Sequence, residues 1–135
     1  MNTHPVWLNL QALRWWRLLG FALVLLVVFL TLRPDPGGQL LNMPMGDKWG
    51  HLLAYGVLTS WFGLLIQRRW HWIPALLFVV LGISLEFIQG LTAYRTFEVF
   101  DMLANSTGVL LGYWLCASRF RYCLQQFEHR YLPSH

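Results

Sequence analysis

The sequence predicts an all-α fold, a transmembrane bundle of four helices followed by a C-terminal amphipathic interfacial helix, and three observations predict it. Of the 135 residues, 56% are hydrophobic and 12% are charged, a balance typical of an integral membrane protein. The apolar residues gather in four runs, each close to the roughly 20 residues that a helix needs to cross the hydrocarbon. The runs lack the alternation of barrel strands, and only helices or closed barrels span lipid.

A single domain of residues 1–135 accommodates the four predicted spans, which cover about residues 18–32, 49–66, 73–91 and 102–117. The first run follows Arg14 and Arg17 as in a signal peptide, but it offers no small-residue cleavage site, so we expect an uncleaved span. Residues 118–132 repeat apolar side chains at helical spacing. This pattern predicts an amphipathic helix on the cytoplasmic surface of the membrane.

The distribution of charge predicts the direction of the spans. Seven basic residues fall on one side of the predicted membrane: Arg14, Arg17, Arg68, Arg69, Arg119, Arg121 and Arg130. Arg33, Lys48 and Arg95 fall on the other side, so the positive-inside rule places both termini in the cytoplasm. The net charge of +4 is explained by this topology, and we expect a lipid bilayer as partner and no nucleic acid.

Polar residues interrupt the last three runs near their predicted outer ends. Asp47 and His51 are four residues apart and share a helix face, with Tyr55 one turn deeper. Glu86 and Gln89 share a face of the third run, and Asp101 and Asn105 share a face of the fourth. Ionisable residues inside spans are costly and mark functional sites by default.

These residues define a predicted pocket with two layers. His51, Glu86 and Asn105 reach similar depths from three helices, and Asp47, Lys48, Arg95 and Asp101 form a rim above them. Small residues in the fourth run, Ala104, Gly108 and Gly112, allow close helix packing. A structural role is also open: Asp47 and Asp101 could cap helices, Lys48 could anchor at the interface, and His51 and Asn105 could hydrogen-bond helices together.

The residue types allow several kinds of chemistry. His51 with Glu86, Asp47 and Asp101 could ligate a divalent cation, although no metal-ligand spacing motif is present. His51 and Glu86 could act as an acid/base pair, with Arg95 and Lys48 holding a phosphate. A pocket that recognises a lipid or glycan headgroup without catalysis is the third possibility.

At these residues the chain resembles the VanZ-like family of small bacterial membrane proteins. The resemblance rests on three blocks between about Gly46 and Gly112, which read Asp47-Lys48-x-x-His51-x-x-x-Tyr55, Gly82-x-x-x-Glu86-x-x-Gln89, and Arg95 to Asp101-x-x-x-Asn105-x-x-Gly108. It implies a four- to five-helix protein of the bacterial inner membrane, in the setting of teicoplanin (glycopeptide) resistance.

Together, the residues and the resemblance lead to one principal hypothesis. We expect an outward-facing pocket that binds, and may modify, an envelope lipid or lipid-linked glycan headgroup. In this hypothesis His51, Glu86 and Asp101 are the catalytic residues. The ligand-binding residues are Asp47, Lys48, Tyr55, Gln89, Arg95 and Asn105. A structural or partner-docking subunit is the main alternative; a small transporter fits less well because the charges lie near one face rather than at the midplane.

Overall fold

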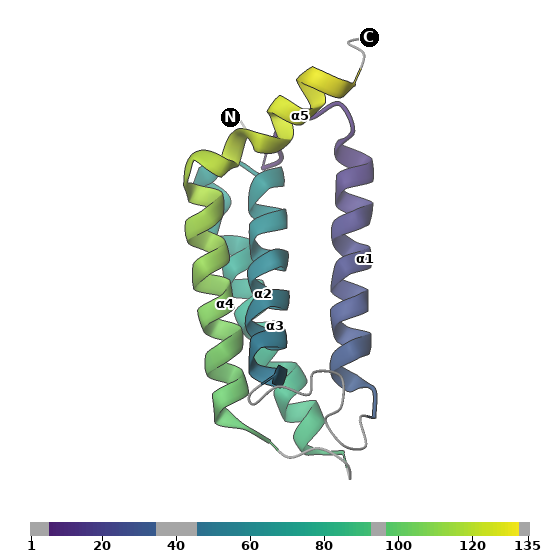
Figure 1. Ribbon diagram of the computed structural model, residues 1–135, viewed down its shortest axis with the longest axis vertical. Helices are drawn as coiled ribbons and strands as arrows, with labels where there is room; N and C mark the ends of the chain where they lie inside the picture. The colour runs from purple at the N-terminus through teal and green to yellow at the C-terminus, as the bar shows by residue number, and fades with distance from the viewer. Residues whose placement is uncertain (1–5, 35–45, 93–96, 133–135) are drawn as a thin grey trace, which may run out of the picture.

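The computed structural model describes residues 6–34, 46–92 and 97–132, and within these ranges its secondary-structure elements are helices, beside one isolated β-bridge between Trp7 and Ile66 (Figure 1). The five α-helices are α1 (Leu13–Leu32), α2 (Gly46–Leu65), α3 (Trp72–Gly90), α4 (Val99–Ala117) and α5 (Cys123–Tyr131). Two short 3₁₀ helices, η1 (Arg68–Trp70) and η2 (Arg119–Tyr122), precede α3 and α5. The all-α prediction is confirmed, and each predicted span lies largely within one of the helices α1–α4.

Two helical segments are long and apolar enough to cross a membrane, Leu13–Leu32 and Arg68–Gly90. Helices α2 and α4 do not meet this test, since they carry most of the glycines and most of the hydroxyl, amide and charged side chains of the bundle. Of the four predicted spans, therefore, two are supported by length and composition.

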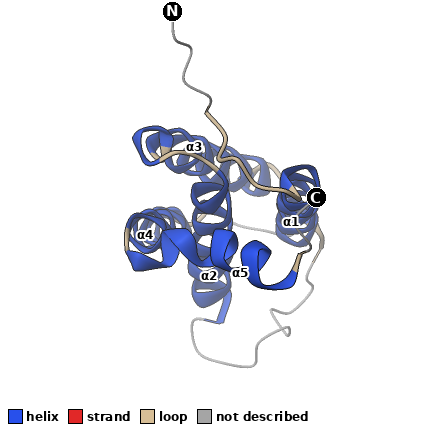
Figure 2. Ribbon diagram, turned by 90° about the horizontal axis from the view of Figure 1, so that it is seen from above, coloured by secondary structure: helices blue, strands red, loops and turns tan. Residues whose placement is uncertain are grey.

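Helix α2 lies at the centre of the bundle, with α1, α3 and α4 around it (Figure 2). Glycines bring the backbones of α2 and α4 together: a Cβ atom added to Gly112 would lie 2.5 Å from the Gly56 carbonyl oxygen, and one added to Gly108 would overlap the Leu52 carbonyl oxygen. The predicted small-residue packing of the fourth run is thus confirmed at Gly108 and Gly112, where only glycine permits this approach.

The bundle exposes many large apolar side chains and buries several polar ones beside its apolar core. Large apolar side chains point outward from all four long helices, as in Leu25, Leu77 and Leu110. Glu86 and Asn105, by contrast, are only 1% and 2% exposed. Such an arrangement is unfavourable in water, because it exposes a contiguous apolar surface and buries polar groups.

The N-terminal segment packs against the far end of α2. The Leu8 amide donates to the Leu65 carbonyl (2.8 Å), and the Gln67 amide donates to the Val6 carbonyl (2.9 Å). Leu10 and Leu124 then join Leu65 and Ile66 in a small apolar cluster. Both ends of the described chain therefore meet at one end of the bundle (Figure 1).

Helix α5 crosses this end of the bundle from α4 toward α1 (Figures 1 and 2). Its Glu128 is 4% exposed. The carboxylate accepts hydrogen bonds from the Gln11 amide (2.7 Å), the Ala12 amide (3.0 Å) and Trp16 Nε1 (2.7 Å). An acidic side chain here satisfies amide groups at the start of α1 and complements the helix dipole. Besides the apolar stripe predicted for residues 118–132, α5 therefore carries a buried carboxylate that connects the end of α4 to the start of α1 through hydrogen bonds.

Substitution of Gly108 by Ala is expected to lower the free energy of unfolding by about 1–3 kcal/mol, because the added methyl group overpacks the α2–α4 contact. The measurement is the thermal unfolding midpoint of the purified protein in detergent. Gly50→Ala is the matched control, since a Cβ atom at Gly50 meets nothing within 4 Å and alanine favours the helix by up to about 1 kcal/mol. Equal midpoints for the two variants would contradict the close packing.

Substitution of Glu128 by Gln is expected to loosen the junction of α5 with α1, because the amide cannot accept all three hydrogen bonds and leaves buried donors unpaired. Hydrogen exchange at the Gln11 and Ala12 amides should accelerate more than tenfold, the change that about 1.4 kcal/mol produces. The exposed Gln126 on the same helix supplies the control Gln126→Ala, which should leave both amides protected.

Candidate functional site

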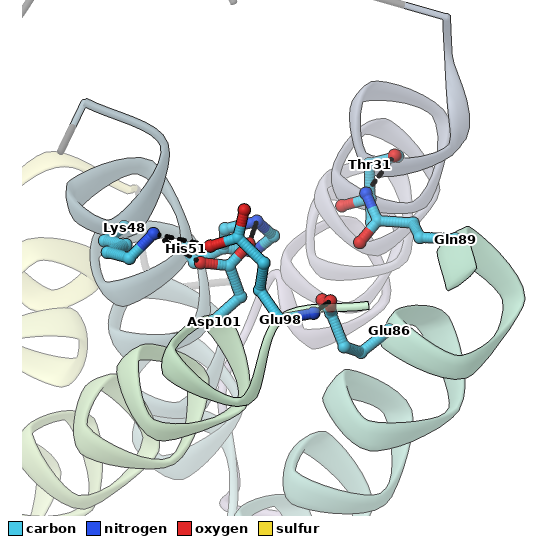
Figure 3. A network of polar contacts seen from close by, with 7 residues as sticks. All are labelled: Thr31, Lys48, His51, Glu86, Gln89, Glu98 and Asp101. Carbon is cyan, nitrogen blue, oxygen red and sulfur yellow. Dashed lines mark hydrogen bonds and ion pairs between the residues drawn. The ribbon is translucent and has the colours of Figure 1, made fainter. Parts of the chain in front are cut away.

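Polar side chains from α2, α3 and α4 converge at the end of the bundle opposite the termini (Figures 1 and 3). They come from the first turns of α2 and α4, which start at this end, and from the last turns of α3, which ends there. The site therefore combines residues that are far apart in the sequence.

An ion-paired network joins α2 to the start of α4 (Figure 3). The Lys48 ammonium lies 2.9 Å from Glu98 Oε2 and 3.3 Å from Asp101 Oδ1, while His51 Nε2 lies 3.6 Å from Asp101 Oδ2. Asp101 is 5% exposed, so its carboxylate is held between a lysine and a histidine away from solvent. Asp101, predicted for the rim of the pocket, contacts the other rim residue Lys48 from the first turn of α4, and its own side chain is buried there.

Glu98 is a site residue that the sequence hypothesis omitted. It occupies the N-cap position of α4. Its side chain pairs with Lys48, while its backbone amide donates to Glu86 Oε1 at 2.7 Å. Glu98 thus links the ion-paired network to α3 (Figure 3). The available signal was its position three residues before Asp101, the spacing at which two acidic residues share the first turn of one helix.

A second polar layer lies deeper between α2, α3 and α4. A Cβ atom on Gly82 would touch Asn105 Nδ2 (3.0 Å) and Tyr55 Cε1 (3.2 Å), so both side chains meet at this glycine. Tyr55 and Asn105 are 1% and 2% exposed. Among the described residues, Tyr55 Oη and Asn105 Oδ1 have no hydrogen-bond partner, which is costly for buried polar atoms.

Gln89 lies apart from this network. Its amide Nε2 donates to the Thr31 carbonyl at 2.7 Å (Figure 3), near the end of α1. Thr92 in turn donates its hydroxyl to the Gln89 carbonyl at 2.6 Å. The structure thus places Gln89 in the contact between α3 and α1.

Two predicted site residues are not placed by the structure. Arg95 lies outside the described residues, and the side chain of Asp47 lies outside the described part as well. Both remain part of the sequence hypothesis only.

The electrostatics of the site are dominated by carboxylates. Glu86, Glu98 and Asp101 accompany the single lysine, Lys48, in the described network. The hydrogen bond to Glu98 and the field of Asp101 raise the pKa of Lys48 above its ordinary value, against a smaller lowering from burial. The ammonium group is therefore retained well into the alkaline range. Within the described ranges, no group of three His, Cys, Asp or Glu side chains is arranged to hold a metal ion.

The predicted reactive pair, His51 and Glu86, is divided between two contacts. His51 pairs with Asp101, and Glu86 accepts the backbone amide of Glu98. The structure therefore separates the two residues of this predicted pair and brings His51 against Asp101 instead.

The structure defines a small helical bundle protein with many exposed apolar side chains, polar residues buried beside an apolar core, an ion-paired site at one end, and two helical segments long and apolar enough to cross a membrane. Comparison with known proteins agrees: the family model VanZ/LLP1 matches residues 2–121. The chain belongs to the VanZ/LLP1 family. An uncharacterized protein of Schizosaccharomyces pombe is 33% identical over 100 residues, which are 71% of this chain and 60% of the yeast protein. The chain thus spans less than two thirds of this relative, and no solved structure matches it.

Substitution of Asp101 by Asn is expected to destabilise the protein by about 1–3 kcal/mol, because it removes the charge of a buried carboxylate that contacts both Lys48 and His51. Glu98→Gln removes the same charge from a side chain that is 46% exposed and should cost less than about 1 kcal/mol. Thermal unfolding of both variants in detergent measures the difference. A larger loss for the Glu98 variant would contradict the central place of Asp101.

Proposed function

We propose that this is a multi-pass membrane protein, with α1–α4 crossing the bilayer and the polar site opening at its outer face. The exposed apolar side chains support this placement, since lipid would solvate the outward Leu, Val, Phe and Trp side chains of all four helices. Helices α2 and α4 are less apolar overall, but several of their polar side chains, among them Thr59, Asp101 and Asn105, are buried inside the bundle. Such polar residues are tolerated in spanning helices when they face the interior of the bundle.

The distribution of arginines supports a cytoplasmic position for both termini. Arg14, Arg17, Arg68 and Arg69 lie at the same end of the bundle as α5 (Figure 1). The positive-inside rule assigns this end to the cytoplasm. The family's bacterial members favour the inner membrane as the location, which leaves the polar site on the envelope side.

The site is proposed to bind the headgroup of an envelope lipid or lipid-linked glycan. One observation carries this proposal: Tyr55 Oη and Asn105 Oδ1 are buried and lack hydrogen-bond partners among the described residues. A hydroxyl or amine group of a ligand would accept from the tyrosine and donate to the amide oxygen. Binding would then recover the free energy that the two unpaired groups cost, about 1–3 kcal/mol for each.

The reaction at such a headgroup, if binding leads to chemistry, would use the His51–Asp101 pair for proton transfer. Membership of the VanZ/LLP1 family favours a role in glycopeptide resistance. In this role, a changed envelope lipid would alter the access of teicoplanin to its target. The match to a fungal protein favours a headgroup that bacterial and fungal membranes share, since fungi build no peptidoglycan.

A structural or partner-docking role is the second candidate, and two contacts favour it. Gln89 of α3 donates a hydrogen bond to the end of α1, and Glu86 of α3 accepts one from the start of α4. In this alternative the polar interior only joins helices, as polar residues do in membrane bundles.

The variant Tyr55→Phe separates the two candidates. In the headgroup proposal, the removal of an unpaired hydroxyl leaves the ligand-free protein as stable as before or more stable. Ligand binding should weaken about tenfold, which corresponds to the loss of one hydrogen bond of about 1.4 kcal/mol. The measurement is the thermal shift in detergent on titration with short-chain phosphatidylethanolamine, phosphatidylglycerol or undecaprenyl phosphate.

A second variant, His51→Ala, should weaken the same thermal shift, because it removes the contact with Asp101 at the polar site. A drop in the ligand-free midpoint of Tyr55→Phe, with no thermal shift from any of the three lipids in the unmodified protein, would support the structural role and end the headgroup proposal.

A further inference from the structure

Arginine side chains at the terminal end of the bundle are stacked on aromatic rings. Five guanidinium groups lie 4.4–5.8 Å from a ring centroid, in the pairs Arg14–Trp15, Arg17–Trp7, Arg69–Trp70, Arg121–Tyr122 and Arg130–Tyr131. We call these five arginines and their rings the basic collar. All five pairs lie at the end that carries α5, η1 and the start of α1.

Three of the five aromatic members of the collar are exposed: Trp15 (60%), Tyr122 (48%) and Tyr131 (64%). Trp7 and Trp70 are partly exposed. Tryptophan and tyrosine rings favour the region between the hydrocarbon and the headgroups. The collar thus presents fixed positive charge at the depth where lipid phosphates lie.

The one carboxylate near the collar is removed from its surface. Glu128 is the only acidic residue after Asp101 in the sequence. It is buried against the start of α1, where it accepts three hydrogen bonds. Its negative charge therefore compensates buried donors of the protein and competes little with an external anion.

We propose that the basic collar binds anionic phospholipid headgroups of the cytoplasmic leaflet in preference to zwitterionic ones. The stacked guanidinium groups hold their N–H donors at the interface, so that less side-chain freedom is lost when a phosphate binds. The inference rests on the membrane placement proposed above but not on the headgroup site at the opposite end.

The arrangement fits lipid better than nucleic acid. The five charges surround the end of a bundle whose sides are apolar, and each is paired with an exposed or partly exposed ring. A nucleic acid surface would instead require the basic groups to follow a backbone across one polar face.

The test uses the full chain reconstituted in phosphatidylcholine vesicles, with spin-labelled phosphatidylglycerol or spin-labelled phosphatidylcholine as the probe. Electron paramagnetic resonance gives the fraction of each probe held at the protein. Phosphatidylglycerol is expected to associate about fivefold more strongly, the ratio for one basic contact with an anionic membrane. The preference should fall toward unity near 1 M salt, where the screening length is about 3 Å.

The variant Arg14→Gln, Arg17→Gln, Arg121→Gln, Arg130→Gln should lose most of this preference. Arg33→Gln, which removes a charge at the opposite end of α1, should retain it. Equal association of the two probes with the unmodified protein, or equal losses in the two variants, would overturn the proposal, as would displacement of phosphatidylglycerol by an equimolar single-stranded oligonucleotide.

If the four-arginine variant does not insert into vesicles, the salt dependence of the unmodified protein tests the proposal: a phosphatidylglycerol preference that salt does not change overturns it. Vesicle flotation distinguishes the membrane placement from the lipid preference of the collar. A protein that fails to float contradicts the membrane placement itself, whereas a protein that floats without lipid preference contradicts only the collar.

Discussion

The close contact between the backbones of α2 and α4 is the constraint on which the rest of the structure depends. Gly56, Gly108 and Gly112 remove the side chains that would keep the two helices apart. The contact also fixes their register, because Gly108 fits against Leu52 and Gly112 against Gly56. This register sets Lys48 and His51 of α2 opposite Asp101 of α4. A slip of one turn, about 5.4 Å, would break both ion pairs at once.

The polar content of the interior divides into two groups with different consequences. Thr59 and Ser60 return their hydroxyl hydrogen bonds to carbonyl groups one turn earlier in α2, so they are satisfied within their own helix. Tyr55 and Asn105 have no such local partner. Residues such as Thr59 and Ser60 therefore add polar groups to α2 without disturbing its packing. Tyr55 and Asn105, by contrast, need a hydrogen-bond partner from a neighbouring helix, from water or from a ligand. This difference distinguishes the candidate site from the remainder of the polar interior.

The sequence was sufficient for the helices and for the close packing at Gly108 and Gly112, because these follow from helical periodicity and residue size. It also named His51 and Asp101 as site residues, and the structure brings these two into contact. Glu98 was omitted although its spacing from Asp101 was visible, because its role depends on the residue at which α4 begins. Glu128 was missed because a carboxylate on an amphipathic helix is ordinarily solvated, and its burial depends on how α5 crosses α1. Helical spacing predicted the face of α3 on which Gln89 lies. It could not predict that α1 packs against this face, because that depends on the tertiary fold.

The two ends of the bundle handle charge in different ways. At the terminal end, the carboxylate of Glu128 is buried, and arginines such as Arg17 lie against aromatic rings. At the other end, the ammonium group of Lys48 pairs with Glu98 and Asp101, so its charge is compensated within the protein. Asp101 also contacts His51. The contacts that neutralise Lys48 therefore also hold the carboxylate beside the histidine, and the loss of Asp101 would affect both charge compensation and the geometry of the site.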